Sequence, residues 1–185
     1  MTDLQNYIHF KKGFFDPAFC KVICDDLQHI DKHKFYGVGD LRGTVGKDPM
    51  LCKLQTEQYG HTIIDQQYDA IFNYLKDVNC PWFETWAGYT WPKFIEYNKG
   101  EHLKNHCDHI YEIFLEGDKP RGVPILTMIT CLNEDYTGGD MVLCNKYRYK
   151  FKTGDTIIFP SNFIFPHCIE EIKSGKRVSM TTWIY

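Results

Sequence analysis

Two residues near the middle of the chain have side chains suited to binding a metal ion. The segment 105–109 reads Asn-His-Cys-Asp-His. We predict that it lies on a strand, where alternate side chains share a face, so that His106 and Asp108 point one way while Cys107 and His109 point the other. An imidazole and a carboxylate on one face can occupy two adjacent positions around a metal ion.

The same His-x-Asp spacing occurs once more, at His29-Ile30-Asp31. This second match lies at the predicted end of a helix, where residues two apart are turned roughly 200° from each other. Its two side chains cannot share a ligand face, so we interpret it as a coincidence.

A third candidate ligand and a candidate anion-binding residue follow the first pair. His167 comes 59 residues after Asp108, and Arg177 opens the predicted final strand ten residues later. That strand is apolar enough to be buried on both sides. A buried arginine needs a carboxylate partner, and no acidic residue lies on its face of the strand. We therefore expect a ligand's carboxylate to bind Arg177, with a further hydrogen bond from the hydroxyl of Ser179.

Two histidines and one carboxylate form the expected ligand set of a non-haem Fe(II) oxygenase. With these residues in order, the sequence resembles the Fe(II)/2-oxoglutarate-dependent dioxygenases, and within them most closely the prolyl 4-hydroxylase-like branch. The resemblance covers about residues 93 to 185. It is carried by Tyr97-Asn98-Lys99-Gly100, His106-Cys107-Asp108, Leu132–Gly139, Gly154–Pro160, His167 and Gly175–Ser179.

The resemblance implies a mainly β fold, a double-stranded β-helix or jelly roll similar to the cupins, with the N-terminal helices packed on its larger sheet. It implies that His106, Asp108 and His167 are the catalytic iron ligands. Since Asp108 is present, where relatives that halogenate have a small apolar residue, we expect hydroxylation.

The resemblance also assigns residues to 2-oxoglutarate, the cosubstrate. Arg177 corresponds to the basic residue of the family and Tyr97 to a tyrosine that often contacts the same distal carboxylate. Thr181 lies near the cosubstrate in relatives. Many relatives have a further tyrosine where this chain has Cys131, so the set of contacts to 2-oxoglutarate differs here.

The elements expected to position these residues divide into a helical first half and a strand-rich second half. Helices are predicted from Pro17 through Ile30 and over Ile63–Val78. Strands are predicted at Lys93–Tyr97, Leu103–His109, Ile125–Leu132, Asp140–Cys144, Thr156–Phe159 and Arg177–Ile184. Such closely spaced strands favour an antiparallel sandwich or barrel.

Two segments outside the motif have alternative interpretations. The glycine-rich stretch Gly37–Gly46 is either a loop that closes over substrate or an ordinary surface loop. The aromatic run Trp82, Trp86, Tyr89 and Trp91 is more often core than substrate site.

Composition bounds the partners and the compartment. The chain has 185 residues and a net charge of −3, which argues against a nucleic-acid or anionic membrane surface as partner. We expect a single domain over 1–185, in which 1–90 supports a catalytic core at 91–185. No apolar run could span a bilayer, no secretory signal is visible and the eight cysteines include no Cys-x-x-Cys pair, so we expect a cytoplasmic protein with reduced thiols.

Three functions fit these observations. The first is an Fe(II)-, O₂- and 2-oxoglutarate-dependent peptidyl hydroxylase, most plausibly a prolyl hydroxylase by resemblance, which releases succinate and CO₂ and uses ascorbate as a supporting reductant. The second is the same chemistry on a free amino acid or another small molecule. The third is a non-catalytic jelly-roll module that binds a divalent ion. The sequence specifies neither the oligomeric state nor the substrate-binding residues.

Overall fold

The structure is a computed structural model in which residues 3–29, 32–35, 46–49, 53–80, 83, 86, 88–90, 92–109 and 123–185 are described. The predicted Gly37–Gly46 loop falls outside these residues except for Gly46, and so do Trp82 and Trp91. Neither helix in these ranges has a stretch long and apolar enough to cross a bilayer.

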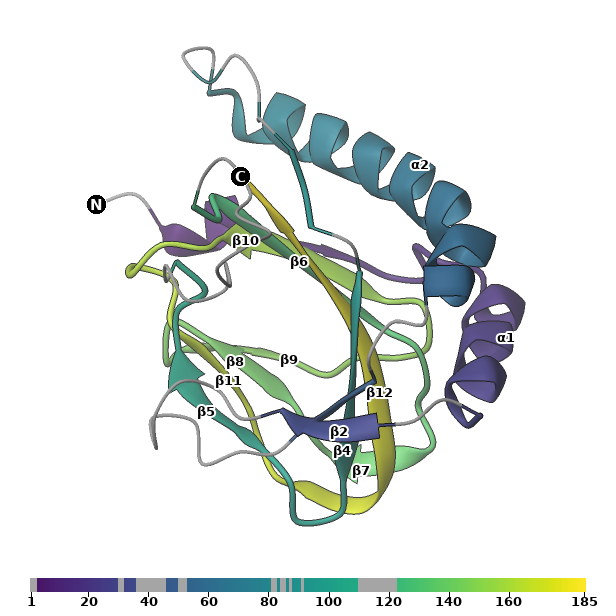
Figure 1. Ribbon diagram of the computed structural model, residues 1–185. Helices are drawn as coiled ribbons and strands as arrows, with labels where there is room; N and C mark the ends of the chain where they lie inside the picture. The colour runs from purple at the N-terminus through teal and green to yellow at the C-terminus, as the bar shows by residue number, and fades with distance from the viewer. Residues whose placement is uncertain are drawn as a thin grey trace.

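The strands form two antiparallel sheets that face each other (Figure 1). The larger sheet has the order β1-β10-β6-β12-β4-β3-β2, with β7 paired to β12. Its strands are β1 (His9–Lys11), β2 (Lys32–Phe35), β3 (Gly46–Pro49), β4 (Lys93–Asn98), β6 (Leu126–Cys131), β7 (Tyr136–Gly138), β10 (Thr156–Pro160) and β12 (Ile172–Ile184). The smaller sheet has the order β5-β11-β8-β9, formed by β5 (Leu103–His106), β8 (Met141–Leu143), β9 (Tyr147–Tyr149) and β11 (His167–Ile169). This arrangement confirms the predicted jelly roll.

Two helices cover the outer face of the larger sheet, as Figure 1 shows. Helix α1 spans Pro17–Leu27 and helix α2 spans Lys53–Val78, after a short 3₁₀ helix at Leu4–Tyr7. The Asp16 carboxylate caps α1 by accepting hydrogen bonds from the amides of Ala18 and Phe19, at 2.6 and 3.3 Å. These bonds satisfy amides that have no partner within the helix, which fixes where α1 begins.

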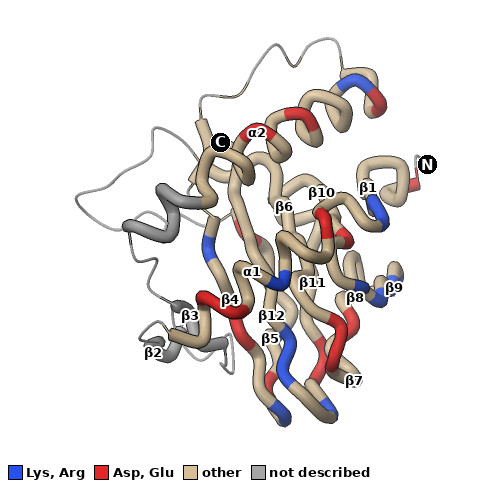
Figure 2. Tube along the Cα trace, turned by 90° about the vertical axis from the view of Figure 1, so that its right-hand side faces the viewer, with Lys and Arg blue, Asp and Glu red and all other residues tan. Residues whose placement is uncertain are grey.

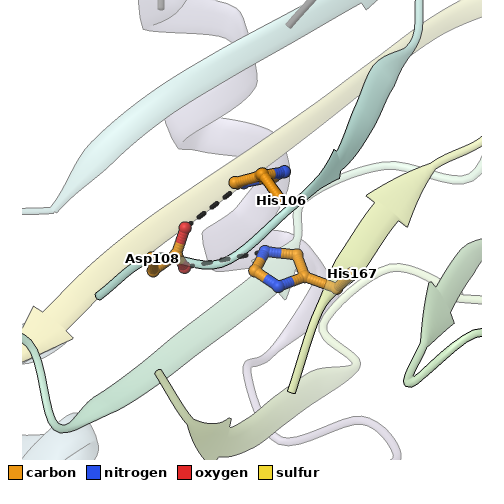
Figure 3. A group of neighbouring side chains, drawn as sticks. All are labelled: His106, Asp108 and His167. Atoms are coloured by element: carbon orange, nitrogen blue, oxygen red, sulfur yellow. Dashed lines mark ion pairs between the residues drawn. The ribbon is translucent and has the colours of Figure 1, made fainter. Parts of the chain in front are cut away.

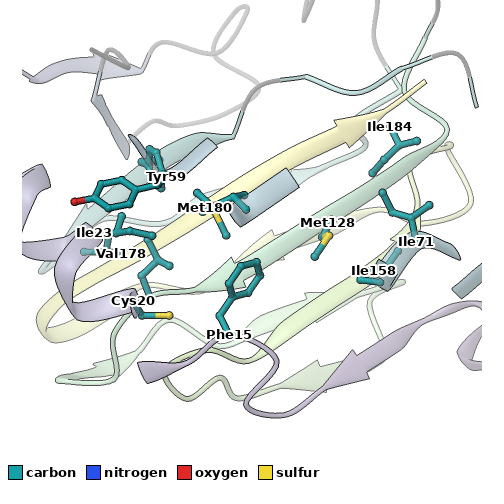
Figure 4. Close-up of a cluster of buried hydrophobic side chains, with 14 of the residues drawn as sticks. Phe15, Cys20, Ile23, Tyr59, Ile71, Met128, Ile158, Val178, Met180 and Ile184 are labelled. Carbon is teal, nitrogen blue, oxygen red and sulfur yellow. The ribbon is translucent and has the colours of Figure 1, made fainter. Parts of the chain in front are cut away.

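The outer hydrophobic core joins these helices to the sheet (Figure 4). Phe15, just before α1, and Ile23, within α1, are buried in one cluster with Val178, Met180 and Ile184 of β12. Thr182, on the same face, accepts a hydrogen bond from Gln67 of α2. Alternate residues of β12 therefore face the helices, which leaves the intervening ones for the space between the sheets.

The inner core lies between the two sheets. Its buried members come from both sheets and include Tyr97, Cys131, Leu143, Phe151 and Phe159. Because both faces of the larger sheet are covered, its interior strand β6 is buried at every position.

Helix α1 ends at Leu27 rather than Ile30, and three further predicted boundaries are also wrong by three residues or more. Helix α2 begins at Lys53 rather than Ile63, because its first part is polar, contains Gly60 and lacks an apolar period. Strand β12 begins at Ile172 rather than Arg177. The last error concerns the strand of the candidate ligands: β5 ends at His106 rather than His109.

Charged residues of both signs are interspersed along the strands and turns. In the view of Figure 2, lysine and arginine positions alternate with aspartate and glutamate positions and form no continuous basic stripe on the part of the chain that is described. One exposed cluster joins Arg148 to Glu170 and Asp140 by ion pairs.

Candidate functional site

The two candidate histidine ligands lie opposite each other in the smaller sheet. Strands β5 and β11 pair so that His106 and His167 are direct register partners. Their rings are tilted by 51° with centroids 4.4 Å apart. The two imidazoles thus come together although they are far apart in the sequence, as the prediction required.

The Asp108 carboxylate completes the group (Figure 3). Its Oδ1 lies 3.2 Å from His106 Nε2, and its Oδ2 lies 3.6 Å from His167 Nε2. One ligand atom from each residue lies within 4.8 Å of those of the other two. Asp108 and His167 are buried, whereas His106 is partly exposed.

Asp108 reaches this position by a turn rather than by strand alternation. After His106 the chain leaves the sheet, and the amide of His109 donates a hydrogen bond to the Ser161 carbonyl at 2.9 Å. Cys107 and His109 do not join the group of candidate ligands. The prediction of shared orientation is therefore right for Asp108, but its stated reason is wrong.

Both imidazoles direct Nε2 toward the carboxylate because Nδ1 faces a main-chain carbonyl. His106 Nδ1 lies 2.8 Å from the Lys104 carbonyl oxygen, and His167 Nδ1 lies 3.4 Å from that of Phe165. A proton on Nδ1 leaves the Nε2 lone pair available for a cation.

The environment of Asp108 favours its charged form. Burial alone would raise the pKa of the Asp108 carboxyl, because it disfavours charge. In the metal-free site, when the two imidazoles are protonated, the charge of His167 and the hydrogen bond and charge of His106 outweigh burial and hold this pKa below its usual value of 3.8. Asp108 is therefore an ionised ligand at neutral pH.

Two hydroxyl groups that the sequence did not point to hold Asp108 in place. Thr127 Oγ1 on β6 donates a hydrogen bond to Asp108 Oδ2 at 2.8 Å. The same Oγ1 lies 2.8 Å from Ser161 Oγ, and both hydroxyl-bearing residues have 0% exposure. A hydroxyl that donates to the carboxylate can accept from its neighbour, so Ser161, Thr127 and Asp108 form a chain of hydrogen bonds.

Arg177 is a buried cation with no acidic partner among the described residues. Its side chain is 1% exposed, and its Nη1 donates to Ser179 Oγ at 3.0 Å. The guanidinium carbon lies 5.6 Å from the ring centroids of both Tyr97 and Phe151. Nε and Nη2 are buried and make no hydrogen bond in this part of the chain. Unpaired donors of a buried charge are costly, so this environment is suited to an anion.

The other predicted cosubstrate residues surround Arg177. Tyr97 on β4 is its register partner and is buried at 2% exposure. Ser179 and Thr181 are buried and lie on the same face of β12 as Arg177, toward the space between the sheets. The structure thus brings the predicted residues into one region; their contacts to a cosubstrate stay predictions.

Of the two described members of the aromatic run before β4, Trp86 contributes to the core, as predicted, whereas Tyr89 is exposed. Trp86 packs against the outer core, with its ring 5.4 Å from that of Tyr68 on α2. Tyr89 forms an isolated bridge with Ile184 at the end of β12.

The donor set fits a ferrous ion. Among the described residues, the group contains two imidazole nitrogens and one carboxylate oxygen and no fourth His, Cys, Asp or Glu. Structural sites for divalent metals tend to be closed by a fourth protein ligand, whereas three ligands leave positions open for reactants.

Comparison with known proteins agrees with this chemistry. The family model described as the 2OG-Fe(II) oxygenase superfamily matches residues 92–185. A PKHD-type hydroxylase of Janthinobacterium sp. (strain Marseille) is 31% identical over 97 residues, which cover 50% of this chain and 42% of the relative. One from Psychrobacter sp. (strain PRwf-1) is 27% identical over 97 residues, covering 50% and 37%. The chain therefore matches only about two fifths of the length of these relatives.

Solved structures share the fold over nearly the whole chain. A viral collagen prolyl hydroxylase from Paramecium Bursaria Chlorella virus-1, in complex with 2OG, has a TM-score of 0.65 at 17% identity and covers 96% of this chain and 95% of its own. A prolyl hydroxylase from Trichoplax adhaerens, bound to a hypoxia inducible factor peptide fragment, has a TM-score of 0.69 at 15% identity, covering 97% and 84%. At these identities the likeness establishes the jelly-roll fold. Since the family model matches half of the chain, including every candidate ligand, the chain belongs to the 2OG-Fe(II) oxygenase superfamily.

Proposed function

We propose that this chain is an Fe(II)- and 2-oxoglutarate-dependent dioxygenase that hydroxylates an unactivated C–H bond. The observation that carries the proposal is the combination of an open three-ligand group with a buried arginine that lacks an acidic partner in the described residues. A metal site alone would serve a structural module equally well. Arg177 has buried donors without a partner in the described part of the chain, so it requires an anion in addition, and a keto diacid supplies one.

Each residue has a distinct task in this proposal. His106, Asp108 and His167 hold the iron, which, when bound, supplies the chemistry that couples decarboxylation of 2-oxoglutarate to hydroxylation. Arg177 binds the distal carboxylate through its planar guanidinium. Ser179 orients this guanidinium by accepting a hydrogen bond from Nη1. Tyr97 and Phe151 pack on the guanidinium and exclude water from it.

The substrate that we favour is a peptidyl residue, most plausibly proline. Support comes from the PKHD-type hydroxylase relatives and from a structural neighbour bound to a peptide fragment. Ascorbate as a supporting reductant, a cytoplasmic location and a single domain over 1–185 stay predictions of the sequence.

Incubation with iron, 2-oxoglutarate and a panel of proline-containing peptides tests the proposal. We expect succinate to form and one peptide to gain the mass of one oxygen atom. Succinate without any modified peptide would favour a small-molecule substrate. Metal binding without succinate would favour the non-catalytic module and contradict the proposal.

A further inference from the structure

The buried thiol of Cys131 has a phenol beside it. Cys131 ends β6 with 0% exposure, and its Sγ lies 3.2 Å from the Asn133 carbonyl oxygen and 3.3 Å from Tyr136 Oη. A thiol that donates to the Asn133 carbonyl can offer the phenol only a weak sulfur acceptor. The Tyr136 hydroxyl proton therefore has no strong acceptor at Cys131.

Tyr136 is held against Arg177 by the main chain. Strand β7 pairs with β12 so that Tyr136 lies opposite Gly175, two residues before Arg177. A Cβ atom added at Gly139 would lie 3.2 Å from both Tyr136 Cε2 and Arg177 Cδ. The ring and the arginine stem thus meet above Gly139, whose φ of +67° is a conformation that favours glycine.

The phenol and the guanidinium interact electrostatically. Burial raises the pKa of the Tyr136 hydroxyl, and the charge of Arg177 opposes this rise. Tyr136 therefore stays neutral and keeps its O–H proton at physiological pH, beside a cation whose Nε and Nη2 are unpaired within the described part of the chain.

We propose that Tyr136 donates a hydrogen bond to the distal carboxylate of 2-oxoglutarate held by Arg177, and so replaces the tyrosine that this chain lacks at position 131. The inference rests on the proposed function and deepens it, because it names the residue that completes the carboxylate site. An anion at the unpaired guanidinium donors is a far stronger acceptor than a thiol sulfur, so the phenol loses little when it turns to the carboxylate.

Direct binding tests the inference without turnover. Binding of 2-oxoglutarate is measured by calorimetry with Mn²⁺ as the metal, for the wild type and for Tyr136→Phe. The variant keeps the ring and removes only the hydroxyl. Because a hydrogen bond to a charged group is lost, we expect affinity to fall about 10- to 100-fold.

A matched control and a second ligand separate this role from a structural one. Tyr149→Phe makes the same change at a half-buried tyrosine of the inner core whose ring packs on Phe10, and it should bind 2-oxoglutarate as the wild type does. The second ligand is 2-oxobutyrate, a keto acid with no distal carboxylate, whose affinity should be equal in the wild type and Tyr136→Phe.

The outcomes distinguish the two proposals. Loss of affinity for 2-oxoglutarate alone supports the inference. If Tyr136→Phe loses equal affinity for both keto acids, or loses affinity for neither, the role of Tyr136 is overturned. The proposed function still stands in that case, provided that the wild type binds 2-oxoglutarate. A wild type that binds no 2-oxoglutarate in the presence of metal overturns the proposed function itself.

Discussion

Replacing Thr127 by valine tests whether the hydroxyl chain behind Asp108 positions the metal site. Valine has nearly the same shape but removes the 2.8 Å hydrogen bond to Asp108 Oδ2 and the contact with Ser161 Oγ. Thr127 is fully buried and Asp108 is 5% exposed, so water does not readily replace the lost partner. The carboxylate is then free to turn away from the orientation in which Oδ1 faces His106.

The size of the effect follows from the type of bond. A hydrogen bond to a charged group contributes about 1.5–3 kcal/mol, equivalent to roughly 10- to 100-fold in affinity. Loss of an outer hydrogen bond to a metal ligand typically weakens metal binding by a similar factor. The hydrogen bond between Thr127 and Asp108 exists in the metal-free protein as well as in the metal-bound one. Its removal therefore weakens metal binding only because the carboxylate is no longer held in the orientation that the metal needs. We therefore expect Mn²⁺ affinity to fall about tenfold, toward the lower end of this range.

Thr130→Val is the matched control. Thr130 lies on the same strand and is 1% exposed, and its hydroxyl lies 2.8 Å from that of Thr156. This hydrogen bond involves neither Asp108 nor its partner Thr127. Both variants should lose stability, by roughly 1–3 kcal/mol each, because each leaves a buried polar partner unpaired. Calorimetric titration with Mn²⁺ separates them, since only Thr127→Val should bind metal more weakly. Equal Mn²⁺ affinities in the two variants would refute the positioning role.

Three further predictions concern the fold and the chemistry. Gly154→Ala places a Cβ 2.1 Å from a main-chain carbonyl oxygen at a φ of +82°, and should lower the Tm by roughly 4–8 °C, for a cost of about 2 kcal/mol. As a control, Gly13→Ala, at a φ of +56° with nothing within 4 Å of the added Cβ, should lower the Tm less. Equal Tm shifts in the two variants would contradict the steric explanation. Burial raises the pKa of the Cys20 and Cys24 thiols to about 12, so iodoacetamide at pH 8 should modify both thiols slowly in the folded protein and rapidly in denaturant. Rapid modification of the folded protein would show that the thiols are accessible and contradict this prediction. With Asp108 in the ligand group, turnover in chloride buffer should give only hydroxylated product by mass spectrometry, and a chlorinated product would contradict the assigned ligand set.

The candidate ligands could be predicted because their chemistry is unusual for their positions. His106, Asp108 and His167 are ligand-type residues in the strand-rich half of the chain, and Arg177 begins a buried stretch that cannot neutralise it. The ordered combination of motifs, rather than the His-x-Asp spacing alone, identified these four residues and the family. It was not enough to explain how Asp108 reaches the site, because the turn after His106 depends on hydrogen bonds to Ser161 and Thr127 that local sequence does not encode.

The missed elements are short or lack a periodic pattern. Strands β1, β7, β9 and β11 have three residues each, too few for alternation to be detected. Thr127 lies in a strand buried throughout, where a threonine has no local signal that distinguishes packing from hydrogen bonding to a ligand residue. The same holds for Tyr136, whose proximity to Arg177 results from the pairing of β7 with β12.

The central claim is that His106, Asp108 and His167 bind iron beside an Arg177 that binds a keto diacid. Succinate formed from 2-oxoglutarate in the presence of Fe(II), measured for the wild type, His106→Ala and Arg177→Ala over a range of 2-oxoglutarate concentrations, tests it most directly. The account predicts turnover by the wild type, none by His106→Ala, and turnover by Arg177→Ala only at much higher 2-oxoglutarate. Succinate formation by both variants at the wild-type rate and concentration dependence would contradict it.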